Sequence, residues 1–471
     1  MLCIIIVNRF RWVACQLDEL EKCTKRRKTL DSILGHLPDT LEATYDQILN
    51  RVPFADVSDA VKLLLWLAFA REPLHIDYLA VIVEFDLEKR VFNLDAKLSS
   101  PVDVLKICSS LVTKIGDNTV QLAHASVKQY VLEKKRTIQP NIIMDPANGD
   151  AFVGQCCLTY LLHSRESHPL DPYDRLAKPI WRRYEQSLIR YSAIYWSQHI
   201  LEAKLDMDAI EQMKELFVLT KFSFKNWVEV YNYSITIMED EMNSKCLLQC
   251  AALHGLTPMV EWLLPSVMGD GGVIYSVEDS EQVKNAASHG YQRNSSMLLE
   301  YEDALSAASA SGHKEVVDLM LEKAADFNTE ELYRKAIHSA SEKGKKEILL
   351  ALLDKGADVN AQEEDLTALQ VASGFNHLEI VQLLLERGAD INKQGKFGNA
   401  LQNASTSNHL EIVQLLLERG ADINKQGKCG NALQSAITHR NKEMVQLLLE
   451  KGADASVNAR AKDRNSLQQA S

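Results

Sequence analysis

Few residues of this chain could carry chemistry, and none completes a catalytic pattern. His124 and Ser126 could act as base and nucleophile, but no carboxylate stands in a motif that would complete a triad, and no Gly-x-Ser-x-Gly turn is present. The pair Glu363-Glu364 falls in a predicted loop, where we expect both carboxylates to be solvated. We therefore predict no catalytic residue and no enzyme activity.

Metal binding and disulfide formation find equally little support. Cys246, Cys250 and His254 fall at i, i+4 and i+8 of a predicted helix, a spacing at which three side chains could share a metal ion. The same residues also suit the buried positions of a helical repeat, and we favour that interpretation. The nine cysteines include no CxxC pair. We predict no metal site, no disulfide framework and a reducing compartment.

Charge and hydropathy exclude further classes of function. The sequence has no Gly-x-x-x-x-Gly-Lys-Ser/Thr loop, so we expect no nucleotide cofactor. A net charge of −12 argues against nucleic acid as a partner. The basic run 25–28 could be a nuclear signal or a solvated helix face, and we favour the second. No apolar run approaches the roughly 20 residues that span a bilayer. We expect no membrane contact and a cytoplasmic protein.

A repeat of 32 residues organises the C-terminal half. An Ala-Asp pair recurs every 32 residues (357 − 325 = 32), at 325–326, 357–358, 389–390, 421–422 and 453–454. Each pair follows a predicted helix with apolar residues at i, i+3 and i+4. Helix ends in a left-handed turn are predicted at Gly356, Gly388, Gly420 and Gly452. Turns of positive φ between paired helices are predicted at Gly312, Gly344, Asn376, Asn408 and Arg440. Arg440 would carry a steric penalty there.

These units resemble ankyrin repeats. The first helix of each pair opens with Thr or Asn followed by Ala-Leu-Gln, at 367–370, 399–402 and 431–434. This is similar to the ankyrin signature Thr-Pro-Leu-His, with Ala for Pro and Gln for His, and we expect the departures to weaken individual turns. Degenerate units at 247–264 and 286–299 bring the count to about seven, and 464–468 begin a partial one. Such a solenoid offers a concave face to a protein ligand.

Two units share an identical framework. Residues 377–396 and 409–428 are the same, and the differences between units fall on the first helix, the inter-helix turn and the loop before it. From these positions we select the candidate partner-binding residues Val371, Phe375, Phe397, Asn403, Ser407, Cys429, Ser435 and His439. Neutral drift at exposed sites explains the same differences, so both interpretations stay open. Phe397 is the first position to mutate, because aromatic anchors dominate interface energetics.

The N-terminal half predicts a winged helix. Helices are expected over 59–70, 75–85 and 99–110, then a hairpin over 112–122 and a helix over 124–135. The third helix offers only Lys106, with Lys114 beyond it, so a structural or protein-contact role is expected rather than DNA binding.

Five segments of this half occur in the order found in one known family: Phe10–Asp18, Leu37–Tyr45, Arg71–Leu74, Cys108–Val112 and Gln121–Val131. Over about residues 9–135 the chain resembles the region after the nucleotide-binding core of fungal NACHT–ankyrin proteins, which are NOD-like receptors of the STAND class. Residues 191–199 resemble their connecting region. The family binds ATP or ADP and oligomerises through its NACHT module, so the resemblance implies oligomers only with that missing module. It also implies a candidate switch contact at His124, and a histidine that merely fixes the wing is the alternative.

The sequence thus predicts a mainly α protein. Residues 1–52 would be helices resembling the end of a NACHT module, 53–140 a winged helix, 141–242 a helical linker and 243–471 ankyrin repeats. The predicted function is protein binding with a regulatory winged-helix segment, as sensor or scaffold of a NOD-like receptor. The alternative is the C-terminal fragment of an ATP-dependent STAND ATPase whose P-loop lies upstream, to which the lead-in 1–8 and the unfinished last repeat point.

Overall fold

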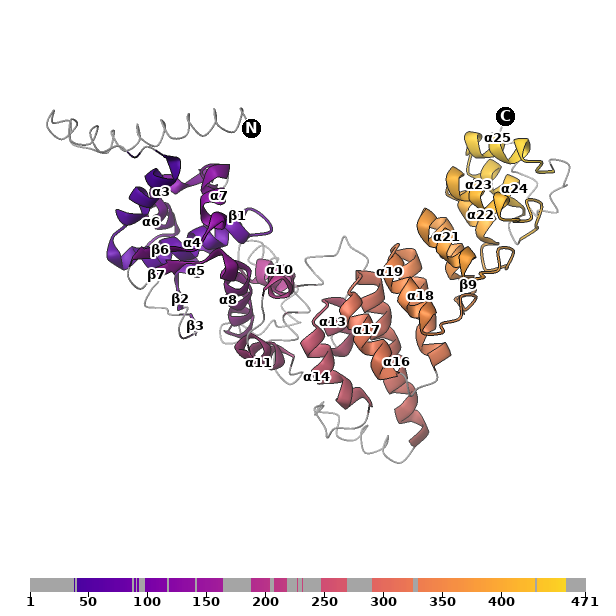
Figure 1. The fold of residues 1–471 in the computed structure, drawn as a ribbon, viewed down its shortest axis with the longest axis horizontal. Coiled ribbons are helices and arrows are strands. Elements are labelled where there is room, and N and C mark those ends of the chain that lie inside the picture. The colour runs from indigo at the N-terminus through magenta and orange to yellow at the C-terminus, as the bar shows by residue number, and fades with distance from the viewer. Residues whose placement is uncertain are drawn as a thin grey trace, which may run out of the picture. The chain divides into compact units, whose positions relative to one another are not determined.

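The computed structural model is mainly helical and divides into two units, Met1–Met242 and Asn243–Ser471 (Figure 1). It describes Pro38, Trp227, Tyr231 and residues 40–163, 188–217, 247–268, 290–324, 329–427 and 430–454. Short gaps interrupt these ranges at 87–88, 90, 93–97, 117, 140–141 and 204–206.

Helix α4 (Val57–Phe69) is the centre of the N-terminal unit. It is apolar on most sides, and Leu63, Leu64 and Trp66 are fully buried. The helix ends before Pro73, which cannot donate to a helical ladder. Four helices pack against it, α5 (Ile76–Val83), α6 (Val104–Cys108), α7 (Ala125–Glu133) and α8 (Gly149–His163). Helix α3 (Leu41–Asn50) contacts α7, while α10 (Leu188–Glu202) and α11 (Met207–Leu216) contact α8.

A small antiparallel sheet completes the winged helix, with the order β1-β5-β4. Its strands are β1 (Leu74–His75), β4 (Val112–Ile115) and β5 (Thr119–Leu122). The other described strands form three two-stranded antiparallel sheets: β2–β3 (Phe85–Asp86, Val91–Phe92), β6–β7 (Arg136–Gln139, Ile142–Met144) and β8–β9 (Gln362–Glu363, Leu366–Thr367). The predicted second helix starts one residue late because Leu74 and His75 pair with β5. The third is a short α6 between two 3₁₀ turns rather than one helix over 99–110.

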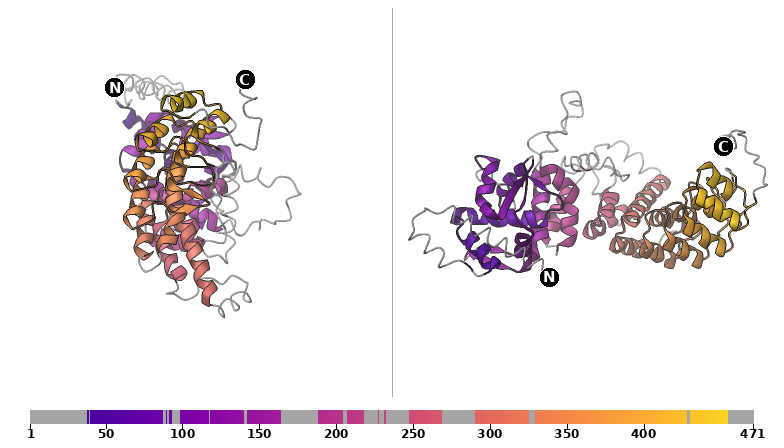
Figure 2. Two further views of the ribbon diagram at one scale, coloured as in Figure 1. Left: turned by 90° about the vertical axis from the view of Figure 1, so that its right-hand side faces the viewer. Right: turned by 90° about the horizontal axis from the view of Figure 1, so that it is seen from above.

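The C-terminal unit is a stack of helix pairs, in which inner helices contact inner helices and outer helices contact outer helices (Figures 1 and 2). Within the described residues there are six pairs, inner before outer: α13 (Leu247–Leu253) and α14 (Thr257–Met268), α16 (Gly290–Ser311) and α17 (Lys314–Lys323), α18 (Thr329–Glu342) and α19 (Lys346–Asp354), α20 (Ala368–Gly374) and α21 (Leu378–Glu386), α22 (Ala400–Thr406) and α23 (Leu410–Glu418), α24 (Ala432–Thr438) and α25 (Lys442–Glu450).

The degenerate unit predicted at 286–299 is not a separate pair in the described structure. Gly290 and Leu299 lie in one helix, α16, because no proline or glycine interrupts the sequence from 291 to 311. Residues 286–289 and 464–468 lie outside the described residues.

The turns take the backbone conformation that the sequence predicts. The inter-helix positions all have positive φ, from 57° at Arg440 to 92° at Gly312, and the glycines after the outer helices have φ between 88° and 93°. Arg440 therefore holds a left-handed conformation that its Cβ disfavours, where two equivalent turns carry Asn376 and Asn408.

Replacing Arg440 with Asn should stabilise the array by about 1 kcal/mol, because asparagine tolerates the left-handed region better. Urea unfolding followed by circular dichroism measures the change as a higher midpoint. Arg419→Asn is the matched control, since Arg419 has an ordinary φ of −88°. Equal midpoints for the two variants would show that no strain is stored at Arg440.

Candidate functional site

Buried glutamine side chains fix the loops that edge the inner helices. We call these loops finger 1 (358–367), finger 2 (390–399) and finger 3 (422–431, of which 428–429 lie outside the described residues). The Oε1 of Gln370 accepts from the Thr367 N–H at 2.8 Å, and its Nε2 donates to the carbonyls of Lys393 at 2.7 Å and Gly398 at 3.0 Å. One side chain thus caps its own helix and holds the next finger.

The following repeat makes the same bonds. Gln402 accepts from the Asn399 N–H at 2.7 Å and donates to the carbonyls of Lys425 at 2.8 Å and Gly430 at 2.7 Å. Gly398 fits because a Cβ there would lie 2.0 Å from the Gln402 Oε1. The glutamine amide thus supplies both the cap and the bridge, and the expectation that Gln in place of His weakens these turns stays a prediction.

A second ladder joins the repeats at the opposite end of the inner helices. The Nε2 of His313, His377 and His409 lies 2.9, 2.6 and 2.9 Å from a carbonyl at the end of the inner helix of the preceding repeat. In the last described repeat Asn441 takes this place and donates to Ser405 and Thr406 carbonyls at 3.1 Å. The same residue types recur in each ladder, Gln370 and Gln402 in the first and His377 and His409 in the second, and the two ladders keep the inner helices in register.

The candidate partner-binding residues lie on this frame in two rows. Phe397 is 57% exposed between the bridged glycines of finger 2, and Phe375 is 57% exposed at the C-cap of α20. The remaining residues differ in exposure: Ser407 and His439 are exposed C-caps, Val371 and Asn403 are half-buried, Ser435 is buried, and Cys429 lies outside the described residues. The structure therefore offers the two phenylalanines, Ser407 and His439 as surface.

Charged side chains pair with one another across the preceding repeats. Arg334 lies 2.9 Å from Glu363, and Lys335 lies 2.8 Å from Asp303 and 3.4 Å from Glu302. Burial raises the pKa of Glu302 against the pull of these cations. The expectation that both members of Glu363-Glu364 are simply solvated is wrong for Glu363, because Arg334 pairs with it from α18.

The remaining sequence candidates have structural surroundings. Cys250 and His254 are buried, and burial lowers the pKa of His254 to about 3. Cys246 lies outside the described residues, within which no group of three His, Cys, Asp or Glu could hold a metal ion. His124 caps α7 by accepting from the Ser126 N–H at 3.1 Å, and the Ser126 hydroxyl is 2.8 Å from the Tyr45 hydroxyl on α3.

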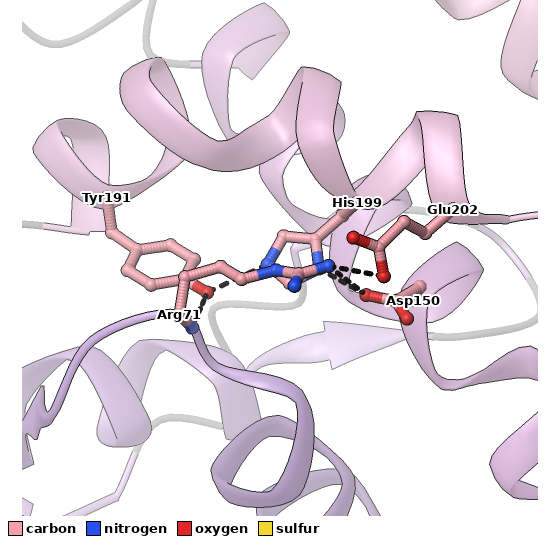
Figure 3. Close-up of polar contacts among 5 residues, drawn as sticks. All are labelled: Arg71, Asp150, Tyr191, His199 and Glu202. Atoms are coloured by element: carbon pink, nitrogen blue, oxygen red, sulfur yellow. Dashed lines mark hydrogen bonds and ion pairs between the residues drawn. The ribbon is translucent and has the colours of Figure 1, made fainter. Parts of the chain in front are cut away.

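Sequence reasoning missed a partly buried polar cluster in the N-terminal unit (Figure 3). The Arg71 guanidinium lies 3.3 Å from Asp150 and 2.8 Å from Glu202, and the Arg71 backbone N–H donates to the Tyr191 hydroxyl at 3.1 Å. The Tyr191 hydroxyl is 2.8 Å from Nε2 of His199, whose Nδ1 is 2.7 Å from Asp150. Burial lowers the pKa of His199 although Asp150 opposes it, so a neutral imidazole can accept from Tyr191 and donate to Asp150.

The neighbouring residue extends the cluster with opposite charge. Glu72 lies 2.7 Å from Arg190 and 3.3 Å from the Tyr195 hydroxyl, both on α10. The segments 71–74 and 191–199, recognised separately in the sequence, are therefore partners that fasten the winged helix to α8 and α10. In the sequence, these contacts could have been suspected from the adjacent opposite charges of Arg71 and Glu72 and from the predicted helix that carries Tyr191 and His199.

Two parts of the chain match known protein families. The family described as "Ankyrin repeats (3 copies)" matches residues 224–363, 305–395 and 369–461, which together cover just over half of the chain. The chain belongs to the ankyrin-repeat proteins. Residues 45–142 match the family described as "GPI inositol-deacylase, winged helix domain". In the part that the structure describes, no helix is long and apolar enough to cross a membrane.

One similar relative of this ankyrin-repeat protein is "Azaphilone pigments biosynthesis cluster protein L" of Monascus ruber. The two are 28% identical over 334 residues, which is 66% of this chain. The match spans 65% of the relative's own length.

Arg71→Met should lower the free energy of unfolding of the N-terminal unit by about 1 kcal/mol, since it removes charged hydrogen bonds from a side chain that solvent partly screens. Urea titration with tryptophan fluorescence detects this, because Trp66, Trp196 and Trp227 are buried in that unit. Lys106→Met is the control, because its single pair with Asp103 is exposed to solvent and should contribute little to stability. A loss no larger than the control's would mean that the cluster does not fasten α8 and α10.

Proposed function

We propose that this ankyrin-repeat protein is a non-catalytic recognition module that binds a protein ligand on the concave face of its array, with the winged helix as a regulatory segment. One observation carries the proposal. The bridging glutamines Gln370 and Gln402 are identical and buried, and the bridging histidines His377 and His409 are identical and half-buried. The surface residues, in contrast, differ between repeats and are exposed: Phe375, Phe397, Ser407 and His439. A rigid frame with variable surface residues suits recognition, because little conformational entropy is lost when the partner binds.

Within a larger system, this module is the sensor or scaffold part of a NOD-like receptor. The order of the N-terminal motifs, the winged-helix match over 45–142 and the fastening of segments 71–74 and 191–199 support this role. Oligomers would form only with a NACHT module. The setting is the cytoplasm, where thiols stay reduced, which suits the buried thiols of Cys108, Cys156, Cys157 and Cys250.

A non-catalytic role agrees with the surroundings of the His124–Ser126 pair. Ser126 is 8% exposed and lies beneath Tyr45, so a substrate would not reach its hydroxyl. The Nδ1 of His124 is hydrogen-bonded to Ser126 at the start of α7, which supports a role as a structural cap rather than a nucleotide sensor.

The second candidate is the C-terminal part of an ATP-dependent STAND ATPase. The length of the relative that lies outside the match, together with the motif order from residue 10 onward, favours it. Sequencing the transcript upstream of Met1 decides between the two: an in-frame P-loop establishes the ATPase, and a stop codon in frame excludes it.

The recognition role predicts that Phe375→Ala/Phe397→Ala loses the protein partner that the wild-type chain captures. Exposed phenylalanines add little to stability, so the variant should fold normally while its binding weakens by about tenfold or more. Affinity capture with the full-length chain, quantified by mass spectrometry, measures this loss. Leu449→Ala removes a 47% exposed leucine from outer helix α25 and should keep the partner. Equal capture by the double variant and the wild type would contradict binding on the concave face.

A further inference from the structure

The fingers of the array differ sharply in charge. Finger 1 carries Glu363, Glu364 and Asp365 at its tip, whereas fingers 2 and 3 carry only lysines between their asparagines and the next helix. The described lysines there are Lys393, Lys396 and Lys425. These basic fingers stand out in a chain whose net charge is −12.

Two of these lysines have no carboxylate partner among the described residues. Lys393 donates to the Asn360 carbonyl at 2.8 Å, so it belongs to the frame. Lys396 and Lys425 are exposed and make no ion pair in the described part of the chain. Lys396 instead places its Nζ 5.4 Å from the centroid of the exposed Phe397 ring, which combines a cation with an apolar surface at one fingertip.

The floor beside these fingers carries no charge. Helices α20, α22 and α24 contain no Asp, Glu, Lys or Arg. Their exposed or half-buried positions bear small side chains, apart from the half-buried Gln434 and the exposed Ile437. The preceding repeats differ, because Arg334 and Lys335 are already paired with Glu363, Glu302 and Asp303. Beside this uncharged floor, the described lysines without a carboxylate partner are Lys396 and Lys425 of fingers 2 and 3.

We propose that fingers 2 and 3, with the inner helices α20, α22 and α24, bind an acidic segment of the protein partner that places an apolar side chain against Phe397. This deepens the proposed function and rests on it. Charge complementarity favours such a segment, because its carboxylates would pair with Lys396 and Lys425. Its backbone would lie on the uncharged inner helices, where no charged side chain loses its hydration on binding. Glu364 and Asp365 repel acids at finger 1, so the acidic stretch of the partner begins at finger 2.

A nucleic acid would also bring negative charge, but the face suits it poorly. The finger lysines are few, the acids of finger 1 lie beside them, and Phe397 is the one exposed aromatic of the described fingers, whereas single strands bind rows of aromatic side chains within a positive groove.

Fluorescence anisotropy with the full chain tests the proposal. The probe is a fluorescein-labelled 12-residue peptide with alternating acidic and small residues around a central leucine. Its controls are the same peptide with lysine for each acid and a 12-nucleotide single-stranded DNA. We expect the acidic peptide to bind at least tenfold more tightly than either control and to weaken when salt rises from 50 to 200 mM.

Lys396→Glu/Lys425→Glu should weaken the acidic peptide at least tenfold, and Lys355→Glu, an exposed lysine at the end of α19, should not. Circular dichroism and the urea midpoint establish that each variant is folded. Equal binding of the acidic and lysine peptides, tighter binding of DNA, or unchanged binding by the double variant would each overturn the proposal. If capture still depends on Phe375 and Phe397 while the acidic peptide shows no preference, the recognition role stands and this inference alone fails.

Discussion

The side-chain amide of Gln370, repeated in Gln402, is the interaction on which the recognition half of this protein depends. A buried polar group without a partner costs about 1–3 kcal/mol, so a side chain that satisfies three backbone groups at once strongly disfavours any other position of the finger. The amide joins the start of one inner helix to two carbonyls of the next finger. Because the frame is held from within, residues at the fingertips and inner-helix ends can vary without cost to the fold.

The N-terminal unit is organised by the same physical constraint. Arg71 and Glu72 follow α4 and carry opposite charges. Arg71 pairs with carboxylates on α8 and α10, and Glu72 pairs with Arg190 on α10. His199 and Tyr191 are largely removed from water, and each is satisfied by the other and by the Asp150 carboxylate or the Arg71 backbone. These contacts fasten the winged helix to the helices α8 and α10 that follow it.

Much of this architecture follows from local sequence, and the rest depends on residues distant in the chain. The period of 32 residues, the left-handed turns and the wing around Gly116 and Asn118 are local, and the structure confirms them. The role of Gln370 is not local, because its acceptors lie 23 and 28 residues away. The same limit explains Glu363, whose cation comes from α18, and α16, which absorbs a predicted repeat because no breaking residue divides it.

In the proposed function, a protein partner occupies the fingers and inner helices of the array. Hydrogen–deuterium exchange of the full chain, with and without its captured partner, tests this claim most directly, since exchange reports which backbone amides the partner covers. The account predicts slower exchange in fingers 2 and 3 and in the first turns of α20, α22 and α24, with the outer helices α21, α23 and α25 unchanged. Slower exchange confined to the outer helices or to the N-terminal unit would contradict it.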